Sequence, residues 1–211
     1  MIPKKEEWIN ALNSRHGHRL QEKISSAAVA VCGLGGLGSN IAITLARMGV
    51  GKLVLIDYDR VDITNLNRQQ YKASQIGMYK TEAMYENIKE ISPYINIEKH
   101  TVRIDKSNAG ELLGYADIIC EAFDDAVCKA ELANFVLESM PCKWLVAASG
   151  MAGIGSANVI RTRRISKRFY LCGDGVSDAS DGIGLVSSRV MLCAAHQAHT
   201  VLRIIANEFE V

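Results

Sequence analysis

A glycine-rich loop between an apolar segment and a helical pattern constrains the fold of this chain more than any other feature. Residues 27–32 (AAVAVC) are apolar, and GLGGLG follows directly at 33–38. Residues 39–48 then place Ile41, Leu45 and Met48 on one face of a helix. A strand, a glycine turn and a helix in this order are typical of the first unit of a parallel α/β sheet.

The chemistry of this loop points to a nucleotide. Gly33, Gly35 and Gly38 fit the spacing G-x-G-x-x-G. Glycines let the backbone approach a phosphate closely, and a helix N-terminus offers it free N–H groups. A second apolar run at 53–56 ends at Asp57, about 20 residues after the loop, where an acidic side chain meets ribose hydroxyls. Together these features predict a nucleotide-binding site.

The rest of the chain alternates between the two kinds of pattern. We expect strands at 95–104, 117–122 and 143–147, and helices at 78–91, 106–113 and 126–139. Such alternation predicts an α/β, Rossmann-like fold of three layers with a mainly parallel central sheet. After Gly150 the pattern changes, so antiparallel strands are expected toward the C-terminal part. There we predict short strands at 158–165 and 169–172, a Gly/Asp/Ser loop at 173–184 and a closing helix at 187–208.

Composition excludes several classes of partner. Lys and Arg number 24 against 23 Asp and Glu, so no overall field attracts nucleic acid or an anionic membrane. No run reaches the roughly 20 apolar residues of a membrane span, and the charged N-terminus does not resemble a secretory signal. The six cysteines are scattered without a C-x-x-C pair, which indicates a reduced, cytoplasmic chain.

We expect a single domain over 1–211, with 1–26 as an N-terminal helical appendage. Within this appendage we expect one helix, over residues 5–24.

The residues after Asp57 help to define the nucleotide. Asp59 and Arg68 follow closely, then Lys80, and later the pair Asp124-Asp125. Separated cations suit the oxygens of a triphosphate, and a carboxylate suits its magnesium ion. Each charge taken alone could equally be an ordinary solvated side chain. The glycine loop alone also fits a NAD-dependent oxidoreductase.

Four segments together are more specific than the loop. They are GLGGLGSN at 33–40, LVLIDYDRVDITNLNRQQY at 53–71, GMYKTEAM at 77–84 and CEAFDD at 120–125. In combination the chain resembles the adenylation domain shared by ThiF, MoeB and the ubiquitin-activating enzymes. The similarity covers about residues 20–206, and is strongest to short ThiF-like proteins of thiamine biosynthesis.

This resemblance implies an activity. The family activates the C-terminal glycine carboxylate of a small ubiquitin-like sulfur carrier protein as an acyl-adenylate and releases pyrophosphate. By analogy we expect a ThiS-like carrier ending in Gly-Gly, ATP and magnesium as cofactors, a homodimer, and a role in thiamine thiazole biosynthesis. The alternatives are a non-catalytic nucleotide-binding partner module, a NAD-dependent oxidoreductase, or a relative that adenylates a small molecule or a tRNA base. The near-neutral charge argues against tRNA.

The resemblance also assigns site residues by motif match. Arg68, Lys80 and Asp124 are the expected catalytic residues, with Asp124 binding magnesium and Lys80 holding the β/γ end of the triphosphate. Asp57 is expected to bind the ribose hydroxyls. In the family an arginine from the partner protomer reaches the phosphates, and Arg15 is the candidate for it. The remaining nucleotide-binding residues are Gly33, Gly35, Gly36, Gly38, Asp59, Asn65 and Gln69.

The chain also departs from the family pattern. Many relatives hold zinc with two C-x-x-C pairs, so no zinc site is expected here. Some form a covalent adduct on a cysteine of the crossover loop, for which Cys172 is the candidate; a structural thiol is the alternative. Where relatives have Asp-Asn, Asp125 adds a negative charge beside the expected metal site.

Two further groups have open interpretations. His196 and His199 are spaced as possible ligands on one helix, but no third ligand is evident, which favours ordinary helix-surface or interface roles. A basic cluster is either a solvated strand edge or a docking surface for an acidic carrier. Its members are Arg161, Arg163, Arg164, Lys167 and Arg168.

Overall fold

Seven strands form one sheet in the order β3-β2-β1-β4-β5-β7-β6 in the computed structural model, which describes residues 2–180 and 182–211. All neighbours are parallel except β6, which runs antiparallel to β7 at the edge. This arrangement confirms the predicted parallel sheet with antiparallel pairing toward the C-terminal part. The strands are β1 (Ala28–Cys32), β2 (Lys52–Ile56), β3 (Asn96–His100), β4 (Ile118–Glu121), β5 (Trp144–Ala148), β6 (Arg161–Ser166) and β7 (Phe169–Gly173).

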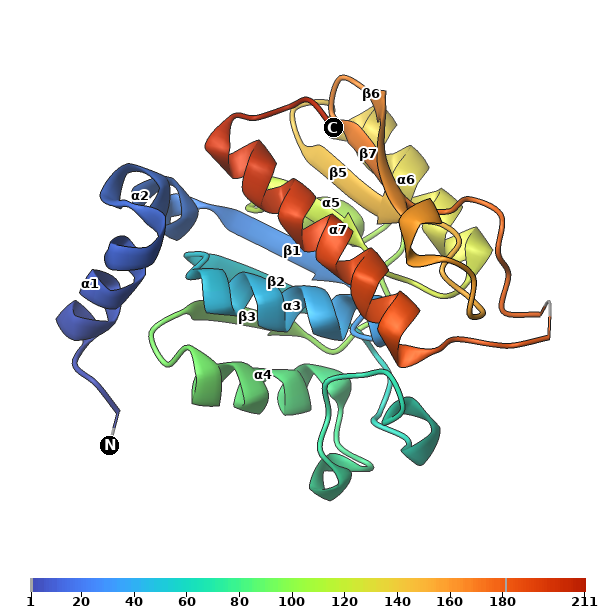
Figure 1. Ribbon diagram of the computed structural model, residues 1–211, viewed down its shortest axis with the longest axis horizontal. Coiled ribbons are helices and arrows are strands. Elements are labelled where there is room, and N and C mark those ends of the chain that lie inside the picture. The colour runs from blue at the N-terminus through green and yellow to red at the C-terminus, as the bar shows by residue number, and fades with distance from the viewer. Residues whose placement is uncertain (1, 181) are drawn as a thin grey trace.

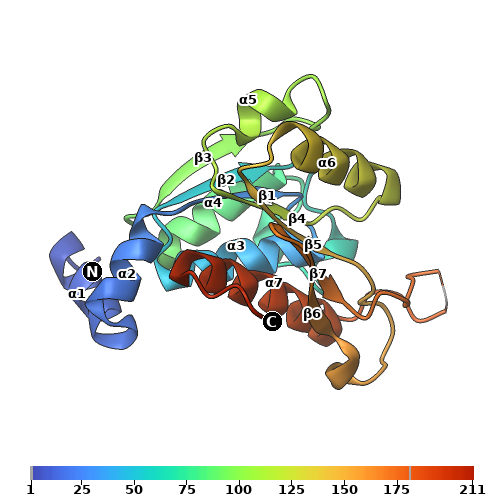
Figure 2. The same ribbon diagram turned by 90° about the horizontal axis from the view of Figure 1, so that it is seen from above.

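Helices cover both faces of the sheet, as Figures 1 and 2 show. One face carries α3 (Gly36–Met48), α4 (Lys80–Ile91) and α7 (Ser187–Ala206); the other carries α5 (Ala109–Leu113) and α6 (Ala126–Ser139). Along β1, Val29 and Val31 enter the first core while Ala30 and Cys32 enter the second. Successive side chains of a strand point to opposite faces, so an apolar run without polar alternation produces a strand buried on both sides. The predicted three-layer architecture is confirmed.

The glycine loop joins β1 to α3 at very close range. Gly33 has a φ of 90°, and a Cβ there would lie 2.9 Å from the carbonyl oxygen of Ala122. A Cβ on Gly38 would overlap the carbonyl oxygen of Gly33. These two positions therefore require glycine, one for the turn and the other for the packing of the helix on the strand end. The helix begins at Gly36, within the loop, rather than at the predicted residue 39.

The N-terminal segment differs from the expected single helix over 5–24. Gly17, with φ 78° and ψ 143°, separates α1 (Lys5–His16) from α2 (His18–Ser26). No residue of α1, all of which are described, is buried. Both helices lie beside the amino ends of the parallel strands, at the side of the molecule opposite the first turn of α7 (Figure 1).

Several predicted boundaries also move. The strand expected at 95–104 ends at His100, and the helix expected from 106 begins at Ala109 because Asp105 accepts the N–H of Ser107 in a local turn. The segment 158–165 divides into the 3₁₀ helix η3 (Ala157–Val159) and β6; two more such helices are η1 (Ile63–Asn65) and η2 (Ala73–Gln75). The closing helix ends at Ala206, before Asn207 with a φ of 69°. Asp181 of the predicted loop lies outside the described residues. Across the described ranges, no helix has the length and apolarity needed to cross a membrane.

Candidate nucleotide site

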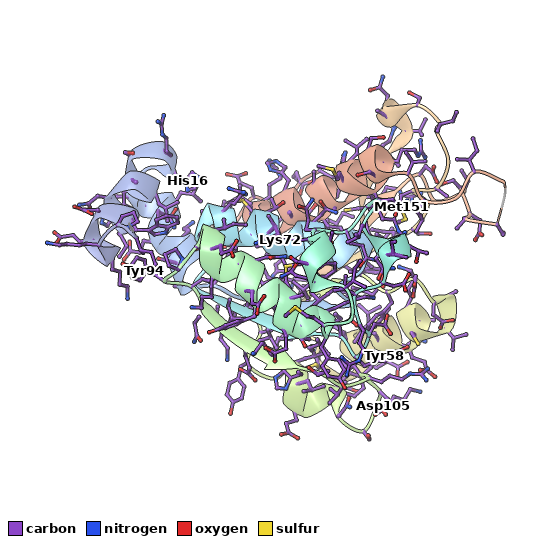
Figure 3. The ribbon with its side chains drawn as sticks, turned by 90° about the horizontal axis from the view of Figure 1, so that it is seen from below. His16, Tyr58, Lys72, Tyr94, Asp105 and Met151 are labelled. Atoms are coloured by element: carbon purple, nitrogen blue, oxygen red, sulfur yellow. The ribbon has the colours of Figure 1, made fainter. Side chains whose placement is uncertain are left out.

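A cleft of about 540 Å³ opens at the carboxyl ends of β1, β2, β4 and β5. From β1 the chain adds β2 and β3 on one side and then β4 and β5 on the other, so the strand order reverses between β1 and β4. Such a reversal is where ligands bind in open α/β sheets. Tyr58 and Met151 line this cleft, at the side of the molecule away from His16 and Tyr94 (Figure 3). The structure brings most predicted site residues to its wall: Gly33, Gly35, Gly36, Asp57, Asp59, Asn65, Arg68, Gln69, Lys80 and Asp124.

Asp57 connects the glycine loop to the end of β2. Its Oδ2 accepts the N–H of Leu34 at 2.6 Å, and its Oδ1 accepts the N–H of Asp59 at 2.7 Å. The residue is almost fully buried, and the cost of desolvating the carboxylate raises its pKa above the ordinary value in spite of Lys80 nearby. Each carboxylate oxygen has a further lone pair, which suits the hydroxyls of a ribose.

Lys80 is the buried cation of the cleft. Its Nζ lies 2.8 Å from Oδ2 of Asp59 and 4.0 Å from Oδ2 of Asp57. The main chain reinforces this placement, because the N–H of Lys80 donates to the carbonyl oxygen of Asp59 at 2.9 Å. The first residue of α4 is thereby attached to the segment that follows β2.

Arg68 and Gln69 each have a buried polar atom with no hydrogen-bond partner among the described residues: Nε of Arg68 and Oε1 of Gln69. The other side of the Arg68 guanidinium is engaged, since Nη1 donates to the carbonyl oxygen of Thr64 at 3.1 Å and to Asn67 at 2.8 Å. A buried polar atom without a partner costs about 1–3 kcal/mol. These two atoms are enclosed by the protein, while other atoms of Arg68 and Gln69 line the cleft.

Asn65 contributes chiefly to the shape of the wall. Its Oδ1 accepts the N–H of Asp62 at 3.0 Å, while Asp62 accepts the N–H of Thr64 at 2.8 Å. These reciprocal bonds close the η1 turn that leads into Arg68.

Asp124 and Asp125 have different roles. Asp124 is exposed on the cleft wall. Asp125 is the N-cap of α6, where its Oδ1 accepts the N–H of Cys128 at 2.8 Å, and this bond lowers the pKa of the Asp125 carboxyl. The additional carboxylate is therefore used by the helix.

The donor set fits magnesium bound together with a triphosphate. Magnesium in such sites takes one or two protein carboxylates and completes its shell with phosphate oxygens and water, and Asp124 offers one carboxylate. Within residues 2–180 and 182–211, no three His, Cys, Asp or Glu side chains gather as a metal-binding group.

Sequence reasoning missed two residues beside the cleft. Glu121 ends β4, and its carboxylate oxygens lie 3.0 and 3.2 Å from Nζ of Lys129, which lines the cleft from α6. An acidic residue at the end of an apolar run, with a lysine in the helix after it, is the signal that could have revealed this pair.

Three predicted residues lie outside the cleft wall: Cys172, Arg15 and Gly38. Cys172 is fully buried on β7, outside the cleft wall, and burial raises the pKa of its thiol, opposite to what a nucleophilic cysteine requires. The structure thus favours the structural-thiol alternative. Arg15 is exposed in the last turn of α1 and is not among the residues that line the cleft of its own chain. Gly38 packs beneath the loop.

The remaining groups have mostly structural contacts. Nδ1 of His196 lies 3.0 Å from Oγ1 of Thr162, which fits an ordinary packing role. In the basic cluster, Arg164 pairs with Glu210 at 3.3 Å, and Arg168 lies over the Trp144 ring. Two members of the cluster remain exposed on the outward face of the edge strand β6: Arg161 and Arg163.

Known proteins resemble this chain in sequence. "Adenylyltransferase and sulfurtransferase MOCS3" from Caenorhabditis briggsae is 34% identical over 141 residues, 66% of this chain and 34% of that protein. "Ubiquitin-like modifier-activating enzyme 5" from Caenorhabditis elegans is 45% identical over 83 residues, 39% of this chain and 20% of that protein. This chain thus spans about a third or less of these relatives.

Solved structures show the same fold. The E. coli tRNA N6-threonylcarbamoyladenosine dehydratase TcdA, in complex with ATP, superposes with a TM-score of 0.87 over 99% of this chain and 98% of that one, at 20% identity. The ThiF family itself matches residues 10–210, nearly the whole sequence. The chain therefore belongs to the ThiF family.

Proposed function

We propose that this protein is an ATP-dependent adenylyltransferase that activates the C-terminal glycine carboxylate of a small ubiquitin-like sulfur carrier. The observation that carries the proposal is the gathering of Arg68, Lys80 and Asp124 on the wall of one cleft, at the carboxyl ends of the parallel strands. Relatives named adenylyltransferases support the reaction class.

The reaction makes modest demands on acid–base chemistry. A carboxylate is already ionised at neutral pH, so no general base is needed. Its oxygen forms a bond to the α-phosphorus, and the bond from that phosphorus to pyrophosphate breaks, with the electron pair leaving on pyrophosphate. The protein has to align these groups and neutralise charge. Arg68 and Lys80 supply cations, Asp57 holds the ribose, and magnesium on Asp124 neutralises phosphate oxygens when bound.

Two segments of the cleft wall support the carrier side of the proposal. Residues 149–152 and 177–179 have mostly small side chains, which would admit a narrow Gly-Gly tail. Outside the cleft wall, Arg161 and Arg163 on β6 would attract an acidic carrier body. A homodimer in which Arg15 serves the partner's cleft, a role in thiamine thiazole biosynthesis and a cytoplasmic location belong to the proposal as family expectations.

An exchange assay tests the proposal. Purified protein, ATP, magnesium and labelled pyrophosphate are incubated with a recombinant ThiS-like carrier ending in Gly-Gly, or with the same carrier lacking its last glycine. We expect carrier-dependent exchange, lost by about 100-fold or more in Arg68→Ala and Asp124→Ala. Full exchange in both variants would refute the assigned roles.

Other outcomes identify the alternatives. Tight ATP binding without exchange for any carrier would indicate a binding module. Exchange driven by a small carboxylic acid or by tRNA would change the substrate class. Protection against unfolding by NAD, and not by ATP with magnesium, would indicate an oxidoreductase, because only a ligand of the folded state stabilises it.

A further inference from the structure

Glu121 and Lys129 form an ion pair at the floor of the nucleotide cleft. Glu121 is 1% exposed at the end of β4, and Lys129 reaches it from α6. The Lys129 ammonium also donates to the carbonyl oxygen of Ala148, at the end of β5, at 3.2 Å. One cation thus connects β4, β5 and α6. Its three donors all have acceptors within the protein, which makes it unsuited to binding a phosphate directly.

The Glu121 carboxylate also holds the loop that carries Asp124. Oε1 of Glu121 accepts the N–H of Phe123 at 2.7 Å. On the other side of Asp124, Asp125 caps α6 through the N–H of Cys128. The residues on both sides of Asp124 are therefore bonded to buried or helical groups, while Asp124 itself faces the cleft.

The backbone of Glu121 is fixed as well. Its carbonyl oxygen accepts Nε2 of Gln197 at 3.0 Å, and the same Nε2 donates to the carbonyl oxygen of Val146 at 3.2 Å. Support for the Asp124 loop thus comes from both helical layers. A buried ion pair is on average no more stabilising than apolar residues of similar volume, so stability alone gives little reason for one beside the cleft.

We infer that Glu121 and Lys129 are positioning residues, which hold the loop over residues 122–125 so that the Asp124 carboxylate meets the magnesium–triphosphate. The inference rests on the proposed function. Residues behind a metal ligand typically change metal affinity by 10- to 100-fold when they are substituted. Loss of the pair should therefore weaken the binding of magnesium together with ATP and leave the cleft otherwise intact.

The test measures magnesium dependence without turnover. The melting temperature at fixed ATP is recorded over a magnesium chloride titration for wild type, Lys129→Met and the matched control Lys143→Met. Lys143 likewise donates to a carbonyl oxygen, that of Gly114, but lies outside the cleft. We expect the magnesium concentration at half-maximal ATP stabilisation to rise about tenfold in Lys129→Met and to stay unchanged in the control.

A second background separates positioning from general destabilisation. With Asp124→Asn already present, adding Lys129→Met should cause no further change in magnesium dependence. A lower basal melting temperature with wild-type magnesium dependence would overturn the inference. So would an equal shift with and without the Asp124 carboxylate.

Two controls keep the test decisive. If Lys129→Met does not fold, the double variant Glu121→Gln/Lys129→Met removes both charges and should show the same magnesium shift. A wild type without magnesium-dependent ATP stabilisation and without exchange would refute the proposed function itself. A responsive wild type with equally responsive variants would refute only the positioning role.

Discussion

The ammonium group of Lys80 lies 2.8 Å from a carboxylate oxygen of Asp59, although the lysine side chain is only 8% exposed. A triphosphate entering the cleft would draw this ammonium from a carboxylate that is itself half exposed. Asp59 thus orients the cation, and water could solvate the Asp59 carboxylate once the ammonium had moved to a phosphate.

Replacing Lys80 with an uncharged residue should greatly reduce pyrophosphate exchange. Lys80→Met leaves Asp57 and Asp59 without their cation and removes neutralisation of the phosphates, so we expect pyrophosphate exchange to fall by about 100-fold or more. The matched control is Lys72→Met, which breaks an exposed pair with Glu90 and should leave exchange near the wild-type rate. Equal losses in both variants would contradict a specific role for Lys80.

The buried carboxyl of Asp57 predicts a dependence of stability on pH. Its pKa is raised above the ordinary 3.8, mainly because burial penalises the charged form. The carboxyl therefore contributes stability that is complete below the unfolded-state pKa and is lost as the pH rises through the folded-state pKa. Relative to Asp57→Asn, wild type should lose stability over that interval, by at most about 1.4 kcal/mol per pH unit.

Urea unfolding without nucleotide, from about pH 4 to pH 7, measures this difference. Asp105 is the contrasting control, since hydrogen bonds from Ser107 lower its pKa. Its contribution is present above the unfolded-state pKa and is lost as the pH falls. Parallel stability curves for wild type and Asp57→Asn would show that burial does not control this carboxyl.

Thiol labelling checks the position of Cys172. Under native conditions N-ethylmaleimide should modify the exposed Cys142 first and leave the buried Cys172 unmodified until the protein unfolds. Cys172→Ala should retain exchange activity, because its sulfur lies outside the cleft wall. Mass spectrometry after incubation with carrier and ATP checks this assignment independently. A covalent carrier adduct on Cys172 would contradict a purely structural role for this thiol.

Charge reversal on β6 tests the proposed docking face. The double variant Arg161→Glu/Arg163→Glu should raise the KM for an acidic carrier about tenfold at low salt and less at high salt. Exchange at saturating carrier should be unchanged, since neither arginine lines the cleft. Arg19→Glu, on the exposed surface of α2, is the control. An unchanged KM in the double variant would remove β6 from the carrier interface.

Local sequence pattern was sufficient for much of this molecule. The strand at 28–32 is so apolar that it has to be buried on both faces, and Gly33 and Gly38 mark where a side chain would collide. The break at Gly17 was missed because a glycine within a helical pattern can be tolerated, and only the packing of the chain decides whether the helix ends there.

The sequence predicted most of the residues that line the candidate site, but it predicted few of the contacts between them. Motif match placed the charge of Asp125 beside the expected metal site, but it did not reveal that this carboxylate also caps α6. The contact of Lys129 with the end of β5 depends on the adjacency of β4 and β5 in the sheet, which spacing alone does not reveal. Likewise, the unpartnered atoms of Arg68 and Gln69 become evident only when every neighbour has a position.

The wall of the cleft runs in sequence from Gly33 to Val190, with contributions from segments that follow β1, β2, β4 and β5. No single segment of the chain forms the whole wall. A nucleotide that engages this wall would therefore bind only the completed sheet, and its binding free energy would add to the stability of the folded state. At saturating ATP, only chains with the complete sheet would gain this stabilisation, and a chain with a misplaced strand would remain easier to unfold.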